Sequence, residues 1–259
     1  MNKVIIDAHL HLNEKVDGTA QGAAFELNRQ LVDAGVSRAI VLHLDFQPWT
    51  AEEVSEAISS YPRLRGFINV HPYKQNPERI LREGVEKLGY IGLKLHPRLQ
   101  EFDVDDERTV RLVQAAGEMN IPVLMCTFPD GTALMQGITP FKFARLAMLC
   151  PSTRIIWAHM GGHHVIDFMM LAKRLPNVYF DISYSLLYYQ TSSIPKDVVY
   201  AMRSMKFNRI FYGSDYPDRP VANSLALSRE FLLQQGISEE DFDKIMGGNA
   251  QDFFGWKDL

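Results

Sequence analysis

The sequence has little cysteine, no excess of positive charge and no long apolar run. Its two cysteines, Cys126 and Cys150, are too few and too far apart to indicate a disulfide scaffold. The formal net charge is -4, and basic residues such as Arg63 and Arg65 form only small groups, which excludes a nucleic-acid surface. No stretch approaches the ~20 apolar residues that cross a bilayer, and no signal-peptide pattern is present. We therefore expect a cytoplasmic protein that binds neither nucleic acid nor membrane.

A glycine-rich dinucleotide fingerprint, an internal repeat and a low-complexity linker are also missing. The 259 residues are 46% hydrophobic, which suits one large core better than two small ones. We expect a single domain over residues 1–259.

Short apolar runs alternate with amphipathic segments along the whole chain. Most of these runs lack polar alternation, as expected for strands that are covered on both faces. The sequence predicts eight such strands: Val4–His9, Arg38–His43, Arg65–Val70, Ile91–Leu95, Pro122–Thr127, Arg154–His159, Asn177–Asp181 and Arg209–Ser214.

The segments between the strands carry helix signals. One predicted helix spans Gln21–Ala34 and ends at Gly35, and another spans Asp105–Met119 with Asp105 as its N-cap. Eight strand–helix units in about 260 residues predict a closed α/β barrel of the (β/α)8, or TIM, type. An open doubly wound sheet is the alternative, but the glycine-rich dinucleotide fingerprint typical of that fold does not follow the first predicted strand. The irregular segments 129–140 and 184–195 are expected to cover the barrel mouth.

Two histidines stand one residue apart at the end of the first strand. Side chains alternate along a strand, so His9 and His11 are expected to share one face while Ala8 and Leu10 share the other. Two such imidazoles can bind a metal, although they can also be polar residues that close a strand. A barrel places its first and last strands side by side, which would bring Asp215 to this pair.

Polar residues gather at the carboxyl ends of the predicted strands, where the active sites of such barrels lie. Six of the eight histidines belong to this layer, and imidazoles, a thiol and carboxylates in one pocket are the ligands of a transition metal such as zinc. The layer comprises His9, His11, His43, Asn69, His71, Lys94, His96, Cys126, His159, Asp181 and Asp215.

Several short motifs together resemble one protein family. They lie in order along the whole chain, at residues 6–11, 92–97, 121–123, 158–162, 177–181, 213–217 and 248–250. With these motifs the chain resembles the amidohydrolase superfamily, in the branch of metal-dependent hydrolases that includes the aminocarboxymuconate-semialdehyde decarboxylase type.

The resemblance implies one divalent metal, zinc or else manganese. His9 and His11 match the metal pair of the first strand, His159 matches the histidine that assists catalysis, and Asp215 matches the aspartate that binds metal and handles the water proton. The fifth strand departs from the family pattern, because Cys126 stands where relatives usually have a metal-binding histidine. Cys126 is interpreted as a fourth ligand, as a non-ligand beside a weaker site or one completed by His159, or as a core residue.

Substrate binding is assigned to Lys94, His96, Arg98 and His71. Lys94 could instead be a carboxylated lysine that bridges two metals, but we favour contact with a substrate carboxylate. Arg98 could bind such a carboxylate through two hydrogen bonds, or it could be a solvated loop residue. An aromatic wall is expected from Phe128, Tyr184, Tyr188 and Tyr189, which ordinary loop packing would also explain.

The leading functional hypothesis is hydrolysis of a small amide, lactone or ester that carries a carboxylate, by a metal-activated water. Asp215 and His159 are its expected catalytic residues. One alternative is a metal-dependent, non-oxidative decarboxylase of an aromatic or unsaturated acid. A second is a metal-free lactonase or a non-catalytic binding barrel. The expected partner is a small-molecule substrate, and a homodimer is compatible with such a barrel.

Overall fold

The computed structural model describes residues 4–256. Within them, eight parallel strands follow the order of the chain in one sheet, from β1 to β8. The strands are β1 (Ile6–Leu10), β2 (Arg38–Leu42), β3 (Leu64–Asn69), β4 (Gly92–Leu95), β5 (Val123–Cys126), β6 (Ile155–Ala158), β7 (Val178–Asp181) and β8 (Ile210–Phe211).

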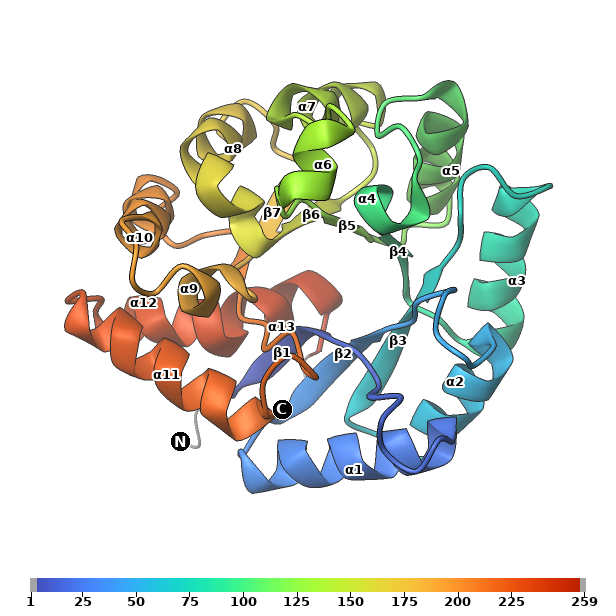
Figure 1. Cartoon of the computed structure of the whole chain (residues 1–259), viewed down its shortest axis with the longest axis horizontal. Helices are drawn as coiled ribbons and strands as arrows, with labels where there is room; N and C mark the ends of the chain where they lie inside the picture. Colours follow the sequence, from blue (N-terminus) through green and yellow to red (C-terminus); the bar gives the residue numbers. More distant parts are fainter. Residues whose placement is uncertain (1–3, 257–259) are drawn as a thin grey trace.

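Helices lie between successive strands and form the outer layer of the molecule (Figure 1). They are α1 (Ala20–Asp33), α2 (Ala51–Ser59), α3 (Pro77–Leu88), α4 (Pro97–Gln100), α5 (Glu107–Glu118), α6 (Gly131–Met135), α7 (Pro140–Leu149), η1 (His159–His164), α8 (Val165–Ala172), α9 (Ser185–Tyr188), α10 (Ile194–Ser204), α11 (Val221–Gln234), α12 (Glu239–Asp243), η2 (Lys244–Gly248) and α13 (Asn249–Phe254).

The barrel closes where the two ends of the sheet meet. The Ala8 amide donates to the Tyr212 carbonyl at 2.9 Å, and the Asp215 amide donates to the His9 carbonyl at 2.9 Å. One step further, the His11 amide donates to the Tyr216 carbonyl at 2.7 Å. The residues that follow β8 therefore continue alongside β1 up to the rim of the barrel.

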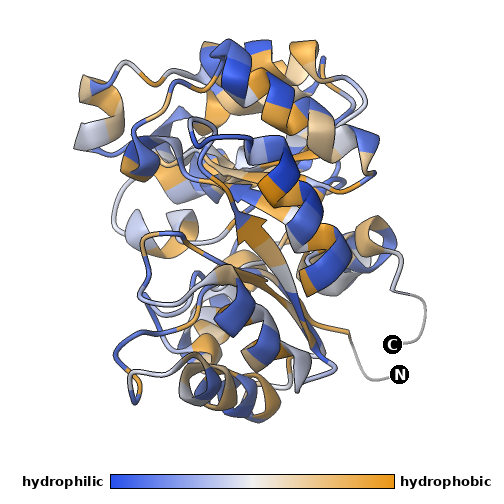
Figure 2. Cartoon of the chain, turned by 90° about the vertical axis from the view of Figure 1, so that its right-hand side faces the viewer, coloured by the Kyte–Doolittle hydropathy of each residue, from blue (hydrophilic) through white to orange (hydrophobic). Residues whose placement is uncertain are grey.

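Alternate side chains of each strand fill either the barrel interior or the layer beneath the helices. The interior cluster includes Ile40, Phe67 and Leu124, and α13 extends it at one end with Ala250. Strands therefore appear apolar along their length, whereas the helices alternate apolar and polar faces (Figure 2). A side chain at Gly92 would meet the Phe67 ring at 2.5 Å, so this glycine makes room for the ring.

The predicted barrel and all eight predicted strands are confirmed, although β8 spans only Ile210–Phe211. The predicted helix N-cap at Asp105 is wrong, because α5 begins one residue later and Asp106 accepts the Arg108 amide at 3.0 Å. The Asp105 carboxylate instead lies 3.4 Å from Arg145. The two segments expected to be irregular contain the short helices α6 and α9.

The expected side-chain alternation of the first strand is broken by an irregularity in its pairing with β2, between Asp7 and Leu10. Ala8 packs in the barrel interior, whereas Leu10 packs in the cluster beneath α1. The prediction that these two residues share a face is therefore wrong. A bulge of this kind re-aims side chains, and here it occurs beside His9.

No helix in residues 4–256 is long and apolar enough to span a bilayer.

Candidate metal and active site

The strongest group of potential ligands joins the first strand to the end of the last. His9 Nε2 lies 3.2 Å from Asp215 Oδ1, and His11 Nε2 lies 3.7 Å from the same oxygen. Burial is the largest influence on both imidazoles and lowers their pKa values below the usual 6.5. The two histidines are therefore neutral at pH 7, the state that binds a metal.

The other nitrogen of each imidazole is already engaged. His11 Nδ1 donates to the Leu42 carbonyl at 2.8 Å, and His9 Nδ1 lies 2.9 Å from Asp181 Oδ2. These contacts place the proton of each neutral ring on Nδ1 and leave a lone pair on Nε2. The two lone pairs and the Asp215 carboxylate thus face one another without a proton between them. Such an arrangement is unfavourable when empty and fits a bound cation.

Asp181, at the end of β7, holds several parts of the site in place. One of its carboxylate oxygens faces His9, and the other accepts the amides of His159 and Ser183, each at 3.0 Å, and the Ser183 hydroxyl. Burial would raise the pKa of Asp181, but His9 and His159 bring it below its usual range. The sequence places Asp181 in the polar layer but gives no sign of this organising role.

Gly213 and Asp7 set the spacing between β1 and the segment after β8. A side chain at Gly213 would lie 2.7 Å from His9 Cβ, so only glycine allows the two segments to approach this closely. Asp7 Oδ1 accepts the amides of His9 and Ser214 at 3.2 and 3.0 Å. Burial raises the pKa of Asp7 to about 7, although these hydrogen bonds act to lower it. Neither residue has a sequence signal of this spacing role.

His159 lies in a turn of unusual backbone conformation, in which residues 159–162 all have positive φ. Its Nδ1 is 3.1 Å from the Ser183 carbonyl, and its ring centroid is 4.9 Å from that of His9. Burial alone would lower the pKa of His159, but Cys126, Asp215 and Asp181 raise it to about 9. At neutral pH this imidazole is therefore a proton donor.

Cys126 ends β5 and is buried beside two histidines. Burial would raise the pKa of its thiol, but the nearby imidazoles of His96 and His159 hold that pKa well below the usual value. Two groups of converging ligand atoms occur in the described part of the chain: His9 with His11 and Asp215, and His9 with His159 and Asp181. Neither contains Cys126, so its role as a ligand stays a prediction.

Three basic residues lie in and just after β4: Lys94 in the strand, His96 directly after it and Arg98 in α4. Lys94 is buried, and burial lowers its pKa, whereas Cys126 and Asp215 act to raise it. His96 Nδ1 and Arg98 Nε are both buried without a hydrogen-bond partner. Arg98 Nη1 donates to Asp130 at 2.8 Å, which ties the turn after β4 to the start of α6. The role of Lys94, His96 and Arg98 in substrate binding stays a prediction.

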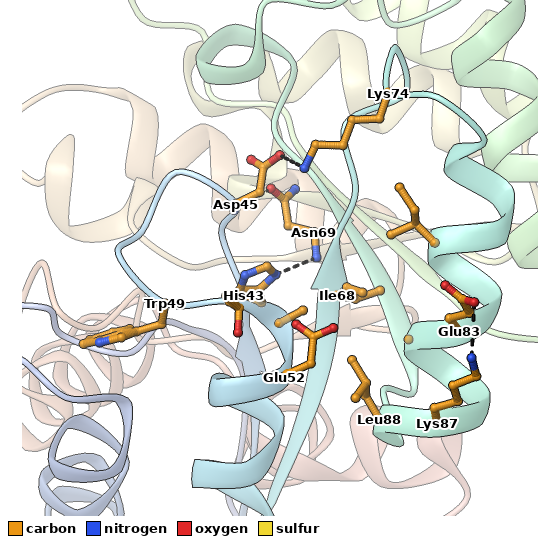
Figure 3. Close-up of a pocket in the computed structure, with 14 residues that line it drawn as sticks. His43, Asp45, Trp49, Glu52, Ile68, Asn69, Lys74, Glu83, Lys87 and Leu88 are labelled. Atoms are coloured by element: carbon orange, nitrogen blue, oxygen red, sulfur yellow. Dashed lines mark hydrogen bonds and ion pairs between the residues drawn. The ribbon is translucent and has the colours of Figure 1, made fainter.

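Two histidines of the predicted polar layer, His71 and His43, belong to neither group of converging ligand atoms. His71 makes its ring contacts with Tyr73 and Phe102, at 5.4 and 5.9 Å between centroids, and its role in substrate binding stays a prediction. His43 follows Leu42, which packs in the interior, and itself lines a cleft between α2 and α3 (Figure 3). The expectation that His43 belongs to the central pocket is therefore wrong.

The expected aromatic wall forms one cluster beside His159. The Phe128 ring lies 5.0, 5.3 and 5.9 Å from those of Tyr184, Tyr188 and Tyr189, and 5.8 Å from that of His159. The rings come from the segments after β5 and β7, so the four residues expected to form an aromatic wall do contact one another.

The chain belongs to the amidohydrolase family, because the family profile described as Amidohydrolase matches residues 6–256. The amidohydrolase superfamily expected from the motifs is therefore confirmed, and so is the expectation that the protein is an enzyme of the amidohydrolase type. No curated protein matches the sequence significantly.

Solved structures of the same fold come from several bacteria. An uncharacterised TIM-barrel protein from Bordetella bronchiseptica has a TM-score of 0.79 at 19% identity, covering 97% of this chain and 98% of that one. An Acinetobacter baumannii protein described as a probable 2-pyrone-4,6-dicarboxylic acid hydrolase, with citric acid bound, has a TM-score of 0.69 at 15% identity and covers 99% and 100%. The 5-carboxyvanillate decarboxylase from Sphingomonas paucimobilis has a TM-score of 0.68 at 12% identity and covers 98% and 99%. These likenesses show the fold.

Proposed function

We propose that this protein is a metal-dependent hydrolase of a small amide, lactone or ester that carries a carboxylate. The observation that carries the proposal is the arrangement of His9, His11 and Asp215. Both imidazoles are fixed through Nδ1, so that their free Nε2 atoms face one carboxylate oxygen. We assign one divalent ion, zinc or manganese, to these residues, with Cys126 as a further ligand. When bound, such an ion supplies Lewis acidity toward water and toward a carbonyl group.

The protein residues divide the proton transfers between them. Asp215 is 16% exposed, so its carboxylate is open to the barrel mouth and accepts the proton of the attacking water. It then returns that proton to the leaving group. His159, with its pKa of about 9, donates a hydrogen bond to the oxygen on which negative charge develops.

The substrate carboxylate is assigned to the donors that follow β4. Lys94 is buried, and His96 Nδ1 and Arg98 Nε are buried without a hydrogen-bond partner, so an anion beside them would satisfy these donors. His71 remains a proposed member of this group. The partner is thus a small acidic molecule.

A decarboxylase is the second proposal, and one observation favours it. His159 is held protonated beside the Phe128 and Tyr184 rings, at 5.8 and 6.1 Å between centroids. An acid in this position could deliver a proton to the carbon of an aromatic or unsaturated substrate once carbon dioxide leaves.

Product analysis tests the two reactions with one panel of carboxylated lactones, amides and aromatic acids. Addition of water without release of carbon dioxide supports hydrolysis, and the reverse supports decarboxylation. Elemental analysis of the purified protein tests the ion, with about one equivalent expected. Full turnover after complete removal of metal would contradict the proposal and favour a metal-free lactonase.

A further inference from the structure

The short helix α6 follows β5 and lies beside α4, which follows β4 (Figure 1). It buries little apolar surface of its own. Among the residues of α6 only Ala133 is buried, whereas Leu134 and Met135 are 50% and 85% exposed. A segment with so few buried apolar contacts opens more easily than the rest of a fold. The position of α6 therefore depends strongly on the polar contacts at its two ends.

Two of these polar contacts join α6 to Arg98. At the start of the helix, Arg98 Nη1 donates to Asp130 Oδ2 at 2.8 Å, and just after its end the Gln136 side chain donates to the Arg98 carbonyl at 3.3 Å. Asp130 Oδ1 accepts the Ala133 amide at 2.9 Å and so caps the helix. Arg98 and Asp130 are 21% and 32% exposed, so water reaches this ion pair and another anion can compete for it.

The guanidinium group of Arg98 can hold a carboxylate better than it holds Asp130. Asp130 accepts from one terminal nitrogen, while Nε is buried without a hydrogen-bond partner. A carboxylate that accepted from Nε and a terminal nitrogen together would make two parallel hydrogen bonds, which is the stronger arrangement. A ligand carboxylate therefore has a physical reason to replace Asp130.

α6 also covers a small cavity beside the proposed metal site. Ala133 of α6 lines this cavity together with Arg98, Cys126 and the rings of Phe128 and Phe143. The cavity has a volume of about 10 Å³, which is room for no more than one water molecule. Movement of α6 would take Ala133 out of the wall and so widen the space next to Cys126.

We infer that the ion pair between Arg98 and Asp130 holds α6 closed in the free protein, and that a substrate carboxylate opens it by replacing Asp130 on Arg98. The inference rests on the proposed function, because it takes Arg98 to be a residue that binds the substrate carboxylate. Asp130 is then an internal competitor of the substrate, and the space beside Cys126 widens only when an anionic ligand is bound.

Two variants break the ion pair from opposite sides. Asp130→Asn keeps a cap for the Ala133 amide, because asparagine caps helices as well as aspartate does, and Arg98→Gln leaves Asp130 in place. Hydrogen exchange at the amides of Leu134 and Gly137, which donate within this turn, measures the opening of α6. Without ligand, exchange should be at least about twofold faster in both variants than in the wild type. Faster exchange in Asp130→Asn alone would point to the cap and overturn the inference.

Glutarate is the ligand probe, with glutaramide as its uncharged analogue. Saturating glutarate should make the same two amides of the wild type exchange at least about twofold faster, and glutaramide should not. By calorimetry, Asp130→Asn should bind glutarate at least about twofold more tightly than the wild type, because the competitor is gone. Asp218→Asn, which removes a charge from the segment after β8, should bind glutarate as the wild type does. Arg98→Gln should bind it at least about tenfold more weakly.

The two ways in which this experiment can fail are distinguishable. Glutarate binding that requires Arg98 but leaves the exchange of α6 unchanged would overturn the inference and leave the proposed substrate site intact. Glutarate affinity that is equal, or equally absent, in the wild type and Arg98→Gln would remove Arg98 from the substrate site and overturn the inference with it.

Discussion

His9 Nδ1 and Asp181 Oδ2 lie 2.9 Å apart, which joins a carboxylate at the end of β7 to an imidazole at the end of β1. The contact fixes both the orientation of the His9 ring and the nitrogen that carries its proton. Carboxylates behind metal-binding histidines have this role in many proteins.

Replacing Asp181 by Asn should therefore weaken metal binding. An amide cannot stabilise the same protonation pattern of His9, and we expect the zinc Kd to rise roughly 10- to 100-fold. Competition with a chromophoric chelator measures the change. Asp33→Asn, at the exposed end of α1, is the control and should bind zinc as the wild type does. An unaltered Kd in Asp181→Asn would remove Asp181 from the organisation of the site.

Asp215→Asn should abolish most turnover and leave the fold intact. Asp215 has a φ of 55°, a conformation that asparagine also adopts, so the backbone need not change. Loss of the proton acceptor should lower kcat by about 100- to 10,000-fold. Steady-state kinetics on the active substrate of the panel measures this, with Asp218→Asn as the matched control. Near-normal kcat would dismiss Asp215 as the base.

Gly213→Ala should disturb the site through its packing. The added methyl group would lie 2.7 Å from His9 Cβ and 3.0 Å from Ser183 Cβ. We expect a loss of about 1 to 3 kcal/mol in the free energy of unfolding, together with weaker zinc binding. Gly131→Ala is the control, because a methyl group there meets no atom within 4 Å. Equal stability of the two variants would contradict this account of Gly213.

Asp7 should make the metal-free protein less stable as the pH rises from about 4 to about 7. Its pKa is raised from 3.8 in the unfolded chain to about 7 in the fold, mainly by burial. Between these values the folded state holds a proton that the unfolded state has lost. The free energy of unfolding therefore falls with pH, by at most roughly 1.4 kcal/mol for each pH unit.

Asp7→Asn removes this titration and keeps an oxygen for the amides of His9 and Ser214. Urea unfolding at pH 4.5 and pH 7.5, with a chelator present, should show a smaller difference in the variant than in the wild type. The same difference in both proteins would mean that Asp7 does not titrate in this range.

The variant Cys126→Ser distinguishes the three interpretations of Cys126, which are a metal ligand, a non-ligand at the site and a core residue. As a fourth ligand, Cys126 supplies a thiolate that zinc prefers over a hydroxyl group, so we expect zinc binding to weaken at least about tenfold. Cys150→Ser is the control, because Cys150 is buried beneath the helices and its thiol is 3.7 Å from the Val110 carbonyl. Zinc stoichiometry and Kd equal to those of the wild type would show that Cys126 is not a ligand.

Much of the fold could be predicted from the sequence because it depends on periodicity. In runs such as Arg38–Leu42, the residues after the arginine are apolar on both faces, as strands inside a barrel must be. The carboxyl ends of parallel strands in a barrel meet at one rim. The convergence of His9 and His11 with Asp215 follows from that topology once the barrel closes.

The rest depends on details that a pattern does not contain. Strict alternation fails between Ala8 and Leu10, because an irregularity in the pairing with β2 changes which face the side chain takes. His43 directly follows β2 and points away from the barrel interior, because Leu42 before it points inward. Asp181 at a strand end has the same pattern whether it binds a metal or orients His9. Only the position of its two oxygens separates these roles.

The seam between β1 and the segment after β8 has one more consequence. His9 and Asp215 are translated far apart in time, so a ribosome-bound chain that has not yet produced Asp215 lacks part of the proposed metal site. An ion bound there would join the first strand to the segment after the last one and so stabilise the closed barrel. It would stabilise the native state by about 2.7 kcal/mol at a free concentration a hundred times its Kd. The concentration of free metal would then also set the stability of the folded barrel.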